Sequence, residues 1–333
     1  MLATAGACLL LIALIGGLAY WLQARHYEST DDAFVAARSF SVAPKVGGYV
    51  TDVPVTDNQH VNAGDLLARI DDRDYRIAVD QAKAQVEVAR GNIDNIQAQI
   101  DSQRQQIDQA KAQVDQAEAQ LKFAEQEEAR AKDLVDKGAG TVQREQQTRS
   151  DLQAQQANTT RTKAALVAAQ LGIKTLQTQL ESARASLRQA QAQLNQANLN
   201  LQYTRVTAAQ SGRVVKLSGA VGTYATPGQS LMMFVPDEVW IVANYKETQL
   251  RDMRPGQPVE VRIDAYPDRK LTGHVDSVQP GSGTAFSLLP AENATGNYVK
   301  VVQRVPVKIV IDNWPADVPV GPGMSVVPWT RVR

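Results

Sequence analysis

Apolar residues recur at every seventh position over two long stretches between residues 72 and 203. A second apolar or small residue usually follows three places later, which is the a/d pattern of a coiled coil, sustained well beyond three or four heptads. The first stretch has Val79, Val86, Ile93, Ile100, Ile107, Val114 and Leu121 with Ala82, Ala89, Ile96, Gln103, Ala110, Ala117 and Ala124; the second has Leu152, Thr159, Leu166, Ile173, Leu180, Leu187, Leu194 and Leu201 with Ala169, Leu176, Ala183, Ala190 and Ala197. A strict seven-residue period predicts helices that supercoil with a left hand.

The two stretches are nearly equal in length and are separated by Gly138-Ala139-Gly140. A glycine directly after Lys137 is typical of a left-handed helix C-cap, and Thr141 can cap the returning helix. We therefore expect residues 72–203 to form an antiparallel helical hairpin with its tip at residues 136–141, rather than a coiled coil that only joins separate chains. At 1.5 Å per residue, each arm would be about 90–100 Å long.

The sequences on either side of this hairpin repeat each other at a constant offset of 164 residues. The residues Gly48, Val50, Val53, Gly64 and Leu67 match Gly212, Val214, Leu217, Gly228 and Leu231. Each copy has a Gly-x-Val strand start and then a glycine-containing turn, where glycine accepts positive φ. We expect residues 42–71 and 204–236 to be two halves of one β domain. We interpret Gly48, Gly64, Gly212 and Gly228, like Gly138 at the tip, as structural turn glycines.

The first residues form a long uncharged run. Residues 2–23 are mostly Leu, Ala, Ile and Gly, and about 20 apolar residues suffice to cross a bilayer. Tyr20 and Trp21, followed by Arg25, are typical of a membrane interface. The alternative is a cleaved signal peptide, but the run lacks a basic start and is long for one. We expect residues 1–24 to be a transmembrane anchor, and residues 25–41 to be a linker and the first barrel strand.

The last hundred residues, 237–333, alternate short apolar runs with turn sequences. We expect turns at Arg254-Pro255-Gly256 and Tyr266-Pro267-Asp268, and further strands at residues 298–311 and 320–332. Several short strands separated by such turns predict a small β-barrel or sandwich.

Composition and spacing argue against catalysis and against nucleic-acid binding. The net charge is zero, there is one cysteine, and the three histidines are scattered. Without a basic excess, a histidine or cysteine cluster, or a phosphate-binding loop, we expect no nucleic-acid partner, no metal, no catalytic residue and no enzyme activity. Asp71-Asp72-Arg73-Asp74 could pass for paired acids, but we interpret it as a helix start, with Asp71 and Asp72 as caps.

The order of these parts resembles the HlyD family of periplasmic adaptors, also called membrane fusion proteins, over essentially the whole chain. The first half-motif is carried by residues 30–35, 43–50 and 57–66 (TDDAFV, APKVGGYV and DNQHVNAGDL). Residues 296–307, GNYVKVVQRVPV, are similar to the EmrA-type branch, whose members work with major facilitator pumps. The resemblance implies an elongated, mixed α/β multi-domain fold with an N-terminal transmembrane helix. A lipoyl-like β domain split by the coiled-coil hairpin and a C-terminal small β-barrel would follow.

The split β unit is similar to a lipoyl or biotinyl carrier domain. In carriers, a lysine on the tight turn between the halves takes the cofactor. Here the hairpin occupies that place, so the resemblance implies no attachment point and we expect no cofactor.

The hairpin tip has the spacing seen in family members that dock onto outer-membrane channels, which often have an Arg, a Leu four residues on and a Ser eleven residues on. This chain has Arg130, Leu134 and Thr141 at these positions, with threonine in place of serine. The resemblance implies that the three residues contact a channel. The alternative is that Arg130 is a solvated helix residue, Leu134 the last seam residue and Thr141 only a cap.

The function implied by the resemblance is that of an adaptor in a tripartite multidrug efflux system. It would link an inner-membrane major facilitator transporter to a TolC-type outer-membrane channel, as a homo-oligomer (trimer or hexamer) anchored in the inner membrane of a Gram-negative bacterium, with its body in the periplasm. Two alternatives stay open. One is an adaptor of an ATP-driven type I polypeptide secretion system, which the run near Val301 disfavours; the other is a carrier-domain subunit of an enzyme complex.

Overall fold

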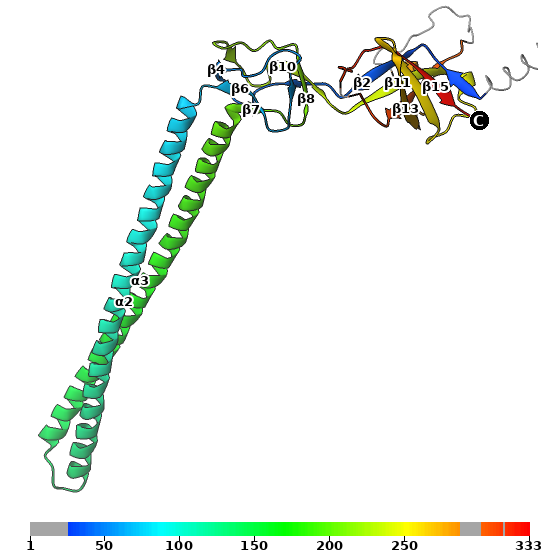
Figure 1. Ribbon diagram of the computed structural model, residues 1–333. Helices are drawn as coiled ribbons and strands as arrows, with labels where there is room; N and C mark the ends of the chain where they lie inside the picture. Colours follow the sequence, from blue (N-terminus) through cyan, green and yellow to red (C-terminus); the bar gives the residue numbers. More distant parts are fainter. Residues whose placement is uncertain (1–25, 287–300, 316) are drawn as a thin grey trace, which may run out of the picture. The chain divides into compact units, whose positions relative to one another are not determined.

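The computed structural model describes residues 26–286, 301–315 and 317–333. It divides into two compact units, one made of Asp72–Tyr203 and the other of the residues before and after this segment (Figure 1). The predicted anchor at residues 1–24 lies outside the described residues. Within the described ranges, no helix combines the length and the apolar character that a bilayer crossing requires.

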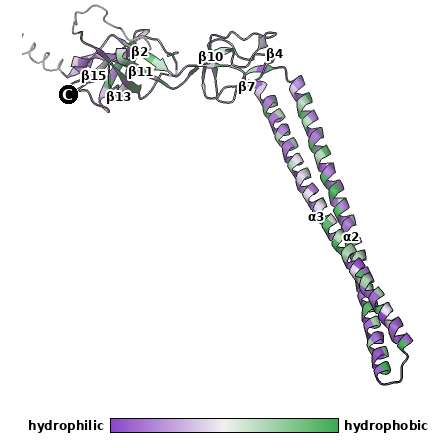
Figure 2. Cartoon of the chain, turned by 180° about the vertical axis from the view of Figure 1, so that it is seen from behind, coloured by the Kyte–Doolittle hydropathy of each residue, from purple (hydrophilic) through white to green (hydrophobic). Residues whose placement is uncertain are grey.

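The helical unit consists of α2 (Arg73–Asp136) and α3 (Val142–Tyr203), which lie side by side and antiparallel (Figure 1). Every predicted a and d residue of both arms is buried or half-buried, while the positions between them are mostly exposed. Figure 2 shows hydrophobic and hydrophilic residues alternating along both helices, as a narrow seam requires. The predicted hairpin is confirmed.

The start of α2 differs in detail from the prediction. Asp72 is the N-cap residue, but its side chain makes no capping hydrogen bond. Its Oδ2 instead accepts a hydrogen bond from Arg76 Nη2 at 2.7 Å, one turn into the helix. The expected side-chain cap at Asp72 is therefore wrong, because the carboxylate is engaged by the arginine four residues on.

The two β halves fold together into one pair of four-stranded sheets. The first half supplies β3 (Phe40–Val42), β4 (Gly48–Asp52), β5 (His60–Val61) and β6 (Leu66–Ile70); the second supplies β7 (Arg205–Thr207), β8 (Gly212–Val215), β9 (Tyr224–Ala225) and β10 (Met232–Pro236). The sheet orders are β3-β10-β8-β5 and β7-β6-β4-β9. Each half therefore lends its short middle strand to the other half, β5 to β8 and β9 to β4. This mutual exchange is what the repeat of 164 residues encodes.

The strands next to the hairpin hold its two ends together. β6 leads into α2 and β7 follows α3, and these two strands pair antiparallel. Ile70 N donates to Thr204 O at 2.8 Å directly beside the helix ends. The long insertion therefore leaves and re-enters the β domain at one place, which lets the two halves meet despite their separation in sequence.

The second β module is a closed barrel. Its strands are β1 (Tyr27–Ser29), β2 (Ala33–Ala37), β11 (Val239–Lys246), β12 (Pro258–Ile263), β13 (Tyr266–Val278), β14 (Arg304–Ile311) and β15 (Val326–Arg331), with short 3-10 turns η1 (Glu247–Gln249) and η2 (Gly283–Phe286). The sheet order is β1-β15-β12-β13-β14-β11-β2. Hydrogen bonds from Val35 N to Met324 O (2.9 Å) and from Gly323 N to Val35 O (2.8 Å) close β2 onto the segment before β15. Closure removes open sheet edges and buries a core of alternating strand residues.

The predicted turn at Tyr266-Pro267-Asp268 is wrong, because β13 already begins at Tyr266. Ile263 lies opposite Tyr266, so the turn is formed by the two residues between them. Regular pairing resumes with Arg262 opposite Lys270. Pro267 thus occupies an irregular stretch where its missing N–H breaks no ladder hydrogen bond.

The last two predicted strands are shorter than expected. β14 begins at Arg304 and β15 at Val326, whereas strands were predicted from residues 298 and 320. Gly321-Pro322-Gly323 interrupts the apolar run before β15, with Gly323 at φ +90°. Residues 298–300 lie outside the described ranges.

Candidate functional site

The tip of the hairpin is closed by a Schellman turn. Gly138 has φ +71°, and its N–H donates to Val135 O at 2.9 Å. Ala139 N donates to Leu134 O at 2.8 Å. These two bonds satisfy carbonyls that the end of α2 would otherwise leave unpaired, and they require a left-handed residue at position 138.

Gly140 is a second structural glycine, and its role does not follow from residue preference alone. A Cβ at this position would lie 2.9 Å from Val135 N and 3.1 Å from Leu134 C, so the backbone could not pass this close to the helix end. The signal in the sequence was the pair of glycines in Gly138-Ala139-Gly140. Glycine is required at position 138 because φ is positive there, and at position 140 because the backbone passes close to the end of α2.

Thr141 is the N-cap of α3. Arg144 N donates to both the Thr141 carbonyl (3.1 Å) and the Thr141 Oγ1 (3.3 Å). The hydroxyl oxygen therefore accepts a bond from the third helical residue, as a threonine cap does. The side chain is nevertheless exposed, so capping and contact with a partner do not exclude each other.

Arg130 and Leu134 are both exposed on the last turns of α2. Arg130 Nη1 lies 2.6 Å from Glu127 Oε1, one turn earlier on the same helix. Leu134 is 43% exposed, whereas its neighbours Ala131 and Val135 occupy the seam. The interpretation of Leu134 as a terminal seam residue is therefore wrong. The tip presents an arginine, a leucine and a threonine to solvent within the last turns of one helix and the start of the next.

The four glycines of the β repeat fall into two kinds. Gly64 and Gly228 lie in turns with φ +89° and +83°, a conformation that favours glycine. Gly48 and Gly212 are the first residues of β4 and β8, so their interpretation as turn glycines is wrong. A Cβ on Gly212 would lie 2.3 Å from Val235 O, and one on Gly48 would lie 2.5 Å from Ile70 Cγ2. Glycine is needed at position 212 because strands approach closely, and at position 48 both for this reason and because φ is +155°.

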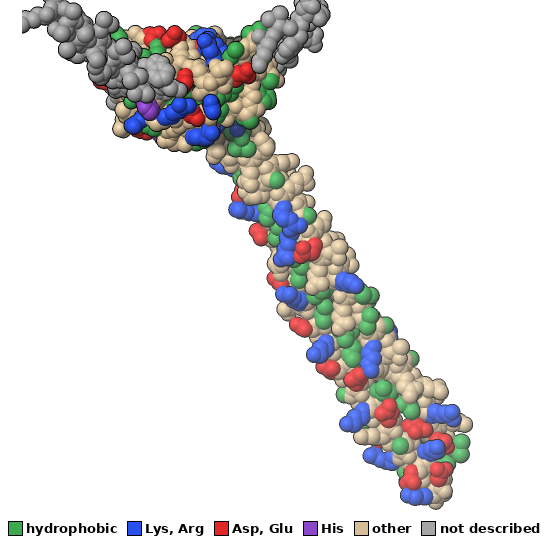
Figure 3. Space-filling model, turned by 90° about the vertical axis from the view of Figure 1, so that its right-hand side faces the viewer, with side chains coloured by type: hydrophobic (Ala, Val, Ile, Leu, Met, Phe, Trp, Pro, Cys, Tyr) green, Lys and Arg blue, Asp and Glu red, His purple; other side chains and the backbone are tan. Residues whose placement is uncertain are grey.

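Charges on the hairpin are mixed and locally paired. Figure 3 shows blue and red side chains interspersed along the face that it presents. Several pairs join residues one turn apart, as between Arg90 and Glu87 or Lys137 and Asp133, and Lys163 pairs with Glu118 across the two helices at 2.7 Å. Exposed pairs of this kind stabilise weakly. They give the rod no single-sign surface for nucleic acid.

Shifted pKa values in the barrel have structural causes. Burial raises the pKa of Tyr245 to about 12, against a hydrogen bond with Thr330 that lowers it. Hydrogen bonds from Arg269 hold the pKa of Asp317 below its ordinary value. In the described ranges, no three His, Cys, Asp or Glu side chains gather as a metal site would require.

A β domain assembled from two sequence halves, a helical hairpin inserted between them and a separate β-barrel together define a barrel-sandwich adaptor. A family model described as "RND MFP, barrel-sandwich hybrid domain" matches residues 38–236, and one described as "CusB-like, beta-barrel domain" matches residues 238–295. The chain belongs to the membrane fusion protein family. The resemblance inferred from the sequence is thereby confirmed.

Two curated relatives are similar over most of their length. The "Colistin resistance protein EmrA" of Acinetobacter baumannii is 37% identical over 319 residues, which cover 96% of this chain and 90% of the relative. The "Multidrug export protein EmrA" of Escherichia coli is 36% identical over 308 residues, which cover 89% and 74%. The EmrA-type branch is thus shown by sequence.

Solved structures agree on the fold. The crystal structure of MacA from Actinobacillus actinomycetemcomitans matches with a TM-score of 0.58 at 18% identity, over 93% of this chain and 80% of that one. A membrane fusion protein of Streptococcus pneumoniae, Spr0693, matches with a TM-score of 0.55 at 16% identity, over 92% and 99%. Identities this low support the shared architecture alone.

Proposed function

We propose that this chain is the periplasmic adaptor of a tripartite multidrug efflux system, which bridges an inner-membrane major facilitator pump and a TolC-type outer-membrane channel. The observation that carries the proposal is the hairpin. Its helices of 64 and 62 residues form two paired arms, each about 95 Å long at 1.5 Å per residue. A protein of this kind works by spanning a distance, while the pump supplies energy and substrate selection.

The printed names of the relatives support this choice of system. Both EmrA relatives are named for drug export or drug resistance, and a third, the EmrK protein of Escherichia coli, is named as a probable multidrug resistance protein at 34% identity over 313 residues. Their alignments run through the β halves, the hairpin and the barrel, so the similarity covers every domain that follows the proposed anchor. This favours drug export over polypeptide secretion.

The layout that we propose keeps the predicted domains. Residues 1–24 anchor the chain in the inner membrane of a Gram-negative bacterium, and residues 25–41 connect this anchor to the barrel and contain its strands β1 and β2, one more than the single strand predicted. Residues 42–71 and 204–236 form the lipoyl-like domain, 72–203 the hairpin and 237–333 the barrel and C-terminal strands. The uncharged run at residues 2–23 supports the anchor, and membership of the adaptor family supports a periplasmic body.

At the tip we propose that Arg130, Leu134 and Thr141 contact the channel. All three side chains are exposed, and Leu134 is an apolar residue outside the seam with 43% of its surface free. Several copies arranged as a closed ring, a trimer or a hexamer, would present several such tips to one channel end. The ring would surround the path that the exported compound takes.

The test is to identify the partners of the full chain in its own cells. Cross-linking followed by purification through a tag on the adaptor should recover a major facilitator transporter and an outer-membrane channel, and mass spectrometry would identify both. Recovery of an ATP-driven transporter in place of the facilitator would overturn the proposal in favour of type I secretion. A tagged adaptor with its anchor deleted serves as the control for unspecific recovery.

A further inference from the structure

The hairpin seam changes in character along its length. Near the middle, Ile96, Ile100 and Leu180 pack with Ala183 in an apolar cluster, to which Ile93 and Leu176 add. In the third of the hairpin nearest the tip, about half of the a and d positions are polar, and these include Glu128, Glu145, Thr148, Gln155 and Thr159. Burial of apolar area therefore binds the arms more weakly here.

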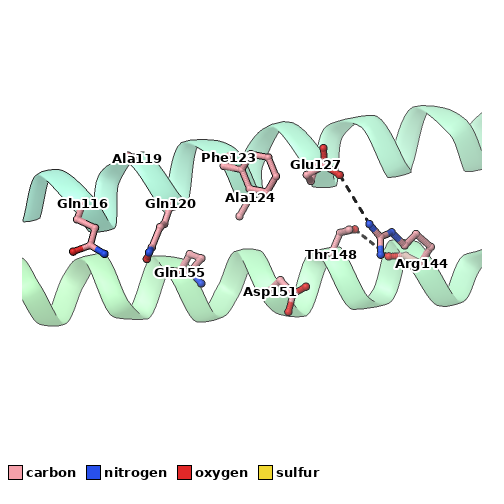
Figure 4. Close-up of a pocket in the computed structure, with 10 residues that line it drawn as sticks. All are labelled: Gln116, Ala119, Gln120, Phe123, Ala124, Glu127, Arg144, Thr148, Asp151 and Gln155. Atoms are coloured by element: carbon pink, nitrogen blue, oxygen red, sulfur yellow. Dashed lines mark hydrogen bonds and ion pairs between the residues drawn. The ribbon is translucent and has the colours of Figure 1, made fainter. Parts of the chain in front are cut away.

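A groove of about 600 Å³ lies between α2 and α3 in this third of the hairpin. Its apolar surface comes from Ala119, Phe123 and Ala124 of α2, and Phe123 is 65% exposed. Figure 4 shows Phe123 on α2 and the side chains of Asp151 and Gln155 on α3, with Glu127 and Arg144 linked at one end. The volume suits a small organic molecule rather than a helix.

Besides the amide side chains of Gln116 and Gln120, two hydrogen-bond acceptors on α3 lie in this groove without a partner in the described part of the chain. Gln155 Oε1 is buried and, among the described residues, is the one buried side-chain oxygen or nitrogen without a hydrogen-bond partner. Within the same ranges, Asp151 makes no hydrogen bond or ion pair in the structure. The cation on the groove, Arg144, is held by Glu127 with 4.0 Å between Nη2 and Oε2. The exposed Asp151 carboxylate is free to accept from a donor with positive charge, and the buried Gln155 Oε1 lacks the donor that a buried oxygen requires.

A second groove nearer the base of the hairpin supplies a comparison. It has about 520 Å³ and is lined by Val88 and Ala89 of α2, by Ser186 and Ala190 of α3, and by amide side chains. Val88 occupies the same heptad position as Phe123 and is 66% exposed. This groove contains neither a charged side chain nor an aromatic ring, so the combination at the tip is not a general property of the coiled coil.

We propose that the groove between Phe123 and Asp151 binds a small amphipathic organic cation. The aromatic or alkyl body of the ligand packs on Phe123 and the two alanines, where a ring face also attracts positive charge. Its ammonium or amine groups donate to the Asp151 carboxylate and, after rotation of the amide, to Gln155 Oε1. Because this site lies on one hairpin, it does not depend on the partners proposed above.

The experiment measures binding of ethidium, a planar aromatic cation with amine donors, to the purified full chain in lipid nanodiscs by fluorescence anisotropy. Asp151→Asn should weaken binding about fivefold, as the loss of an exposed ion pair does. Phe123→Ala should weaken it about tenfold through lost stacking and apolar contact. The matched controls, Asp108→Asn and Val88→Ala, remove an acid and an exposed apolar residue outside this groove and should bind as the wild type does. Circular dichroism checks that all four variants keep their helices.

A second dye of opposite charge tests whether the groove requires a cation. The aromatic anion 8-anilinonaphthalene-1-sulfonate should bind at least tenfold more weakly than ethidium, and Asp151→Asn should reduce this difference. Equal binding of the two dyes, or equal losses in the control and groove variants, would overturn the proposal. A change in sedimentation caused by Phe123→Ala alone would also overturn it, since the groove would then be a contact between copies of this chain.

Discussion

Glycines in this protein mark two different physical needs, and the distinction decides what a substitution does. Gly64 has φ +89°, and a Cβ added there would meet no atom within 4 Å, so only the backbone conformation favours glycine. Gly212 has an ordinary φ, but a Cβ would meet Val235 O at 2.3 Å and Phe234 Cε1 at 2.6 Å. Strain at the first is local, whereas the second would push apart paired strands β8 and β10.

Replacing Gly212 by alanine should therefore destabilise the β domain more than replacing Gly64. We expect a loss of about 2–3 kcal/mol or more for Gly212→Ala, because a packed strand pair must shift. For Gly64→Ala we expect about 1–2 kcal/mol, the cost of a left-handed conformation. Thermal unfolding of the two variants checks the order. Equal losses, or a larger loss at Gly64, would show that close strand approach is not what selects glycine at position 212.

Tyr245 is a second residue whose burial has a measurable consequence. Its side chain is fully buried in the barrel core, with its hydroxyl 2.8 Å from Thr330 Oγ1, and burial raises its pKa from 10.0 to about 12. The folded protein thus keeps this proton at pH values where the unfolded chain loses it. The stabilising contribution is complete below pH 10 and is lost as the pH rises through 12.

We expect the barrel to lose about 3 kcal/mol of unfolding free energy between pH 10 and pH 12 through Tyr245 alone. Tyr245→Phe should remove this part of the pH dependence, so the difference between wild type and variant is the quantity to measure by denaturant unfolding. The same slope in both proteins would contradict the assignment of the raised pKa to this tyrosine.

The hairpin shows which features of an element its sequence determines. Every a and d residue predicted for the two arms lies in the seam, because the seven-residue period follows directly from helix geometry. The turn at the tip was predictable at Gly138, because helix C-caps strongly favour glycine. The need for glycine at position 140 was not, because it depends on how closely the returning chain passes the end of α2. In the barrel, the turn before Tyr266 was misplaced, because Pro267 is a turn signal in sequence and a tolerated irregularity in the sheet.

Of the candidate site, the sequence predicted the exposed arginine and the Thr141 cap by spacing. Extending the seven-residue series from Leu121 places Val135 in the seam and Leu134 beside it, so the exposure of Leu134 could have been inferred from the period alone. The sequence could not predict the groove at Phe123, which arises where facing seam residues fail to fill the space between the arms. Such a feature depends on side chains from both helices and becomes visible only once their register is known.

Two hydrogen bonds between α2 and α3 mark the ends of a segment that can be deleted from both helices without changing how their remaining residues pair. Gln103 Nε2 donates to Ala169 O at 2.9 Å, beside Gly172, and Thr159 Oγ1 donates to Ala117 O at 3.3 Å. Deleting residues 104–110 and 162–168 removes one heptad from each arm between these contacts. The seams stay in phase, and the reach falls by about 10 Å.

We expect this shortened adaptor to keep its helix content and thermal midpoint by circular dichroism, but to lose drug resistance in cells. A deletion of residues 104–110 alone is the control. It should destabilise the hairpin, because one arm then lacks its partners. Full resistance from the doubly shortened chain would argue against an adaptor whose length is matched to the distance that it spans.

At the scale of the whole molecule, segments far apart in the sequence pair with each other in both β modules. The hairpin returns at the paired strands β6 and β7, and the barrel joins β1 and β2 from the first described residues with β11–β15 from the last. Early and late segments must therefore both be present before either β module closes.

The central claim is that the tip of the hairpin meets an outer-membrane channel, and site-specific photo-cross-linking tests it most directly. A photoreactive amino acid is placed at position 134 on the tip or at position 88 near the hairpin base, in cells that also produce the pump and the channel. Both side chains are exposed in the free chain, by 43% and 66%. We predict a cross-linked product at position 134 that contains the channel, and none at position 88. Absence of the channel from the product at 134, or equal yields at both positions, would contradict the claim.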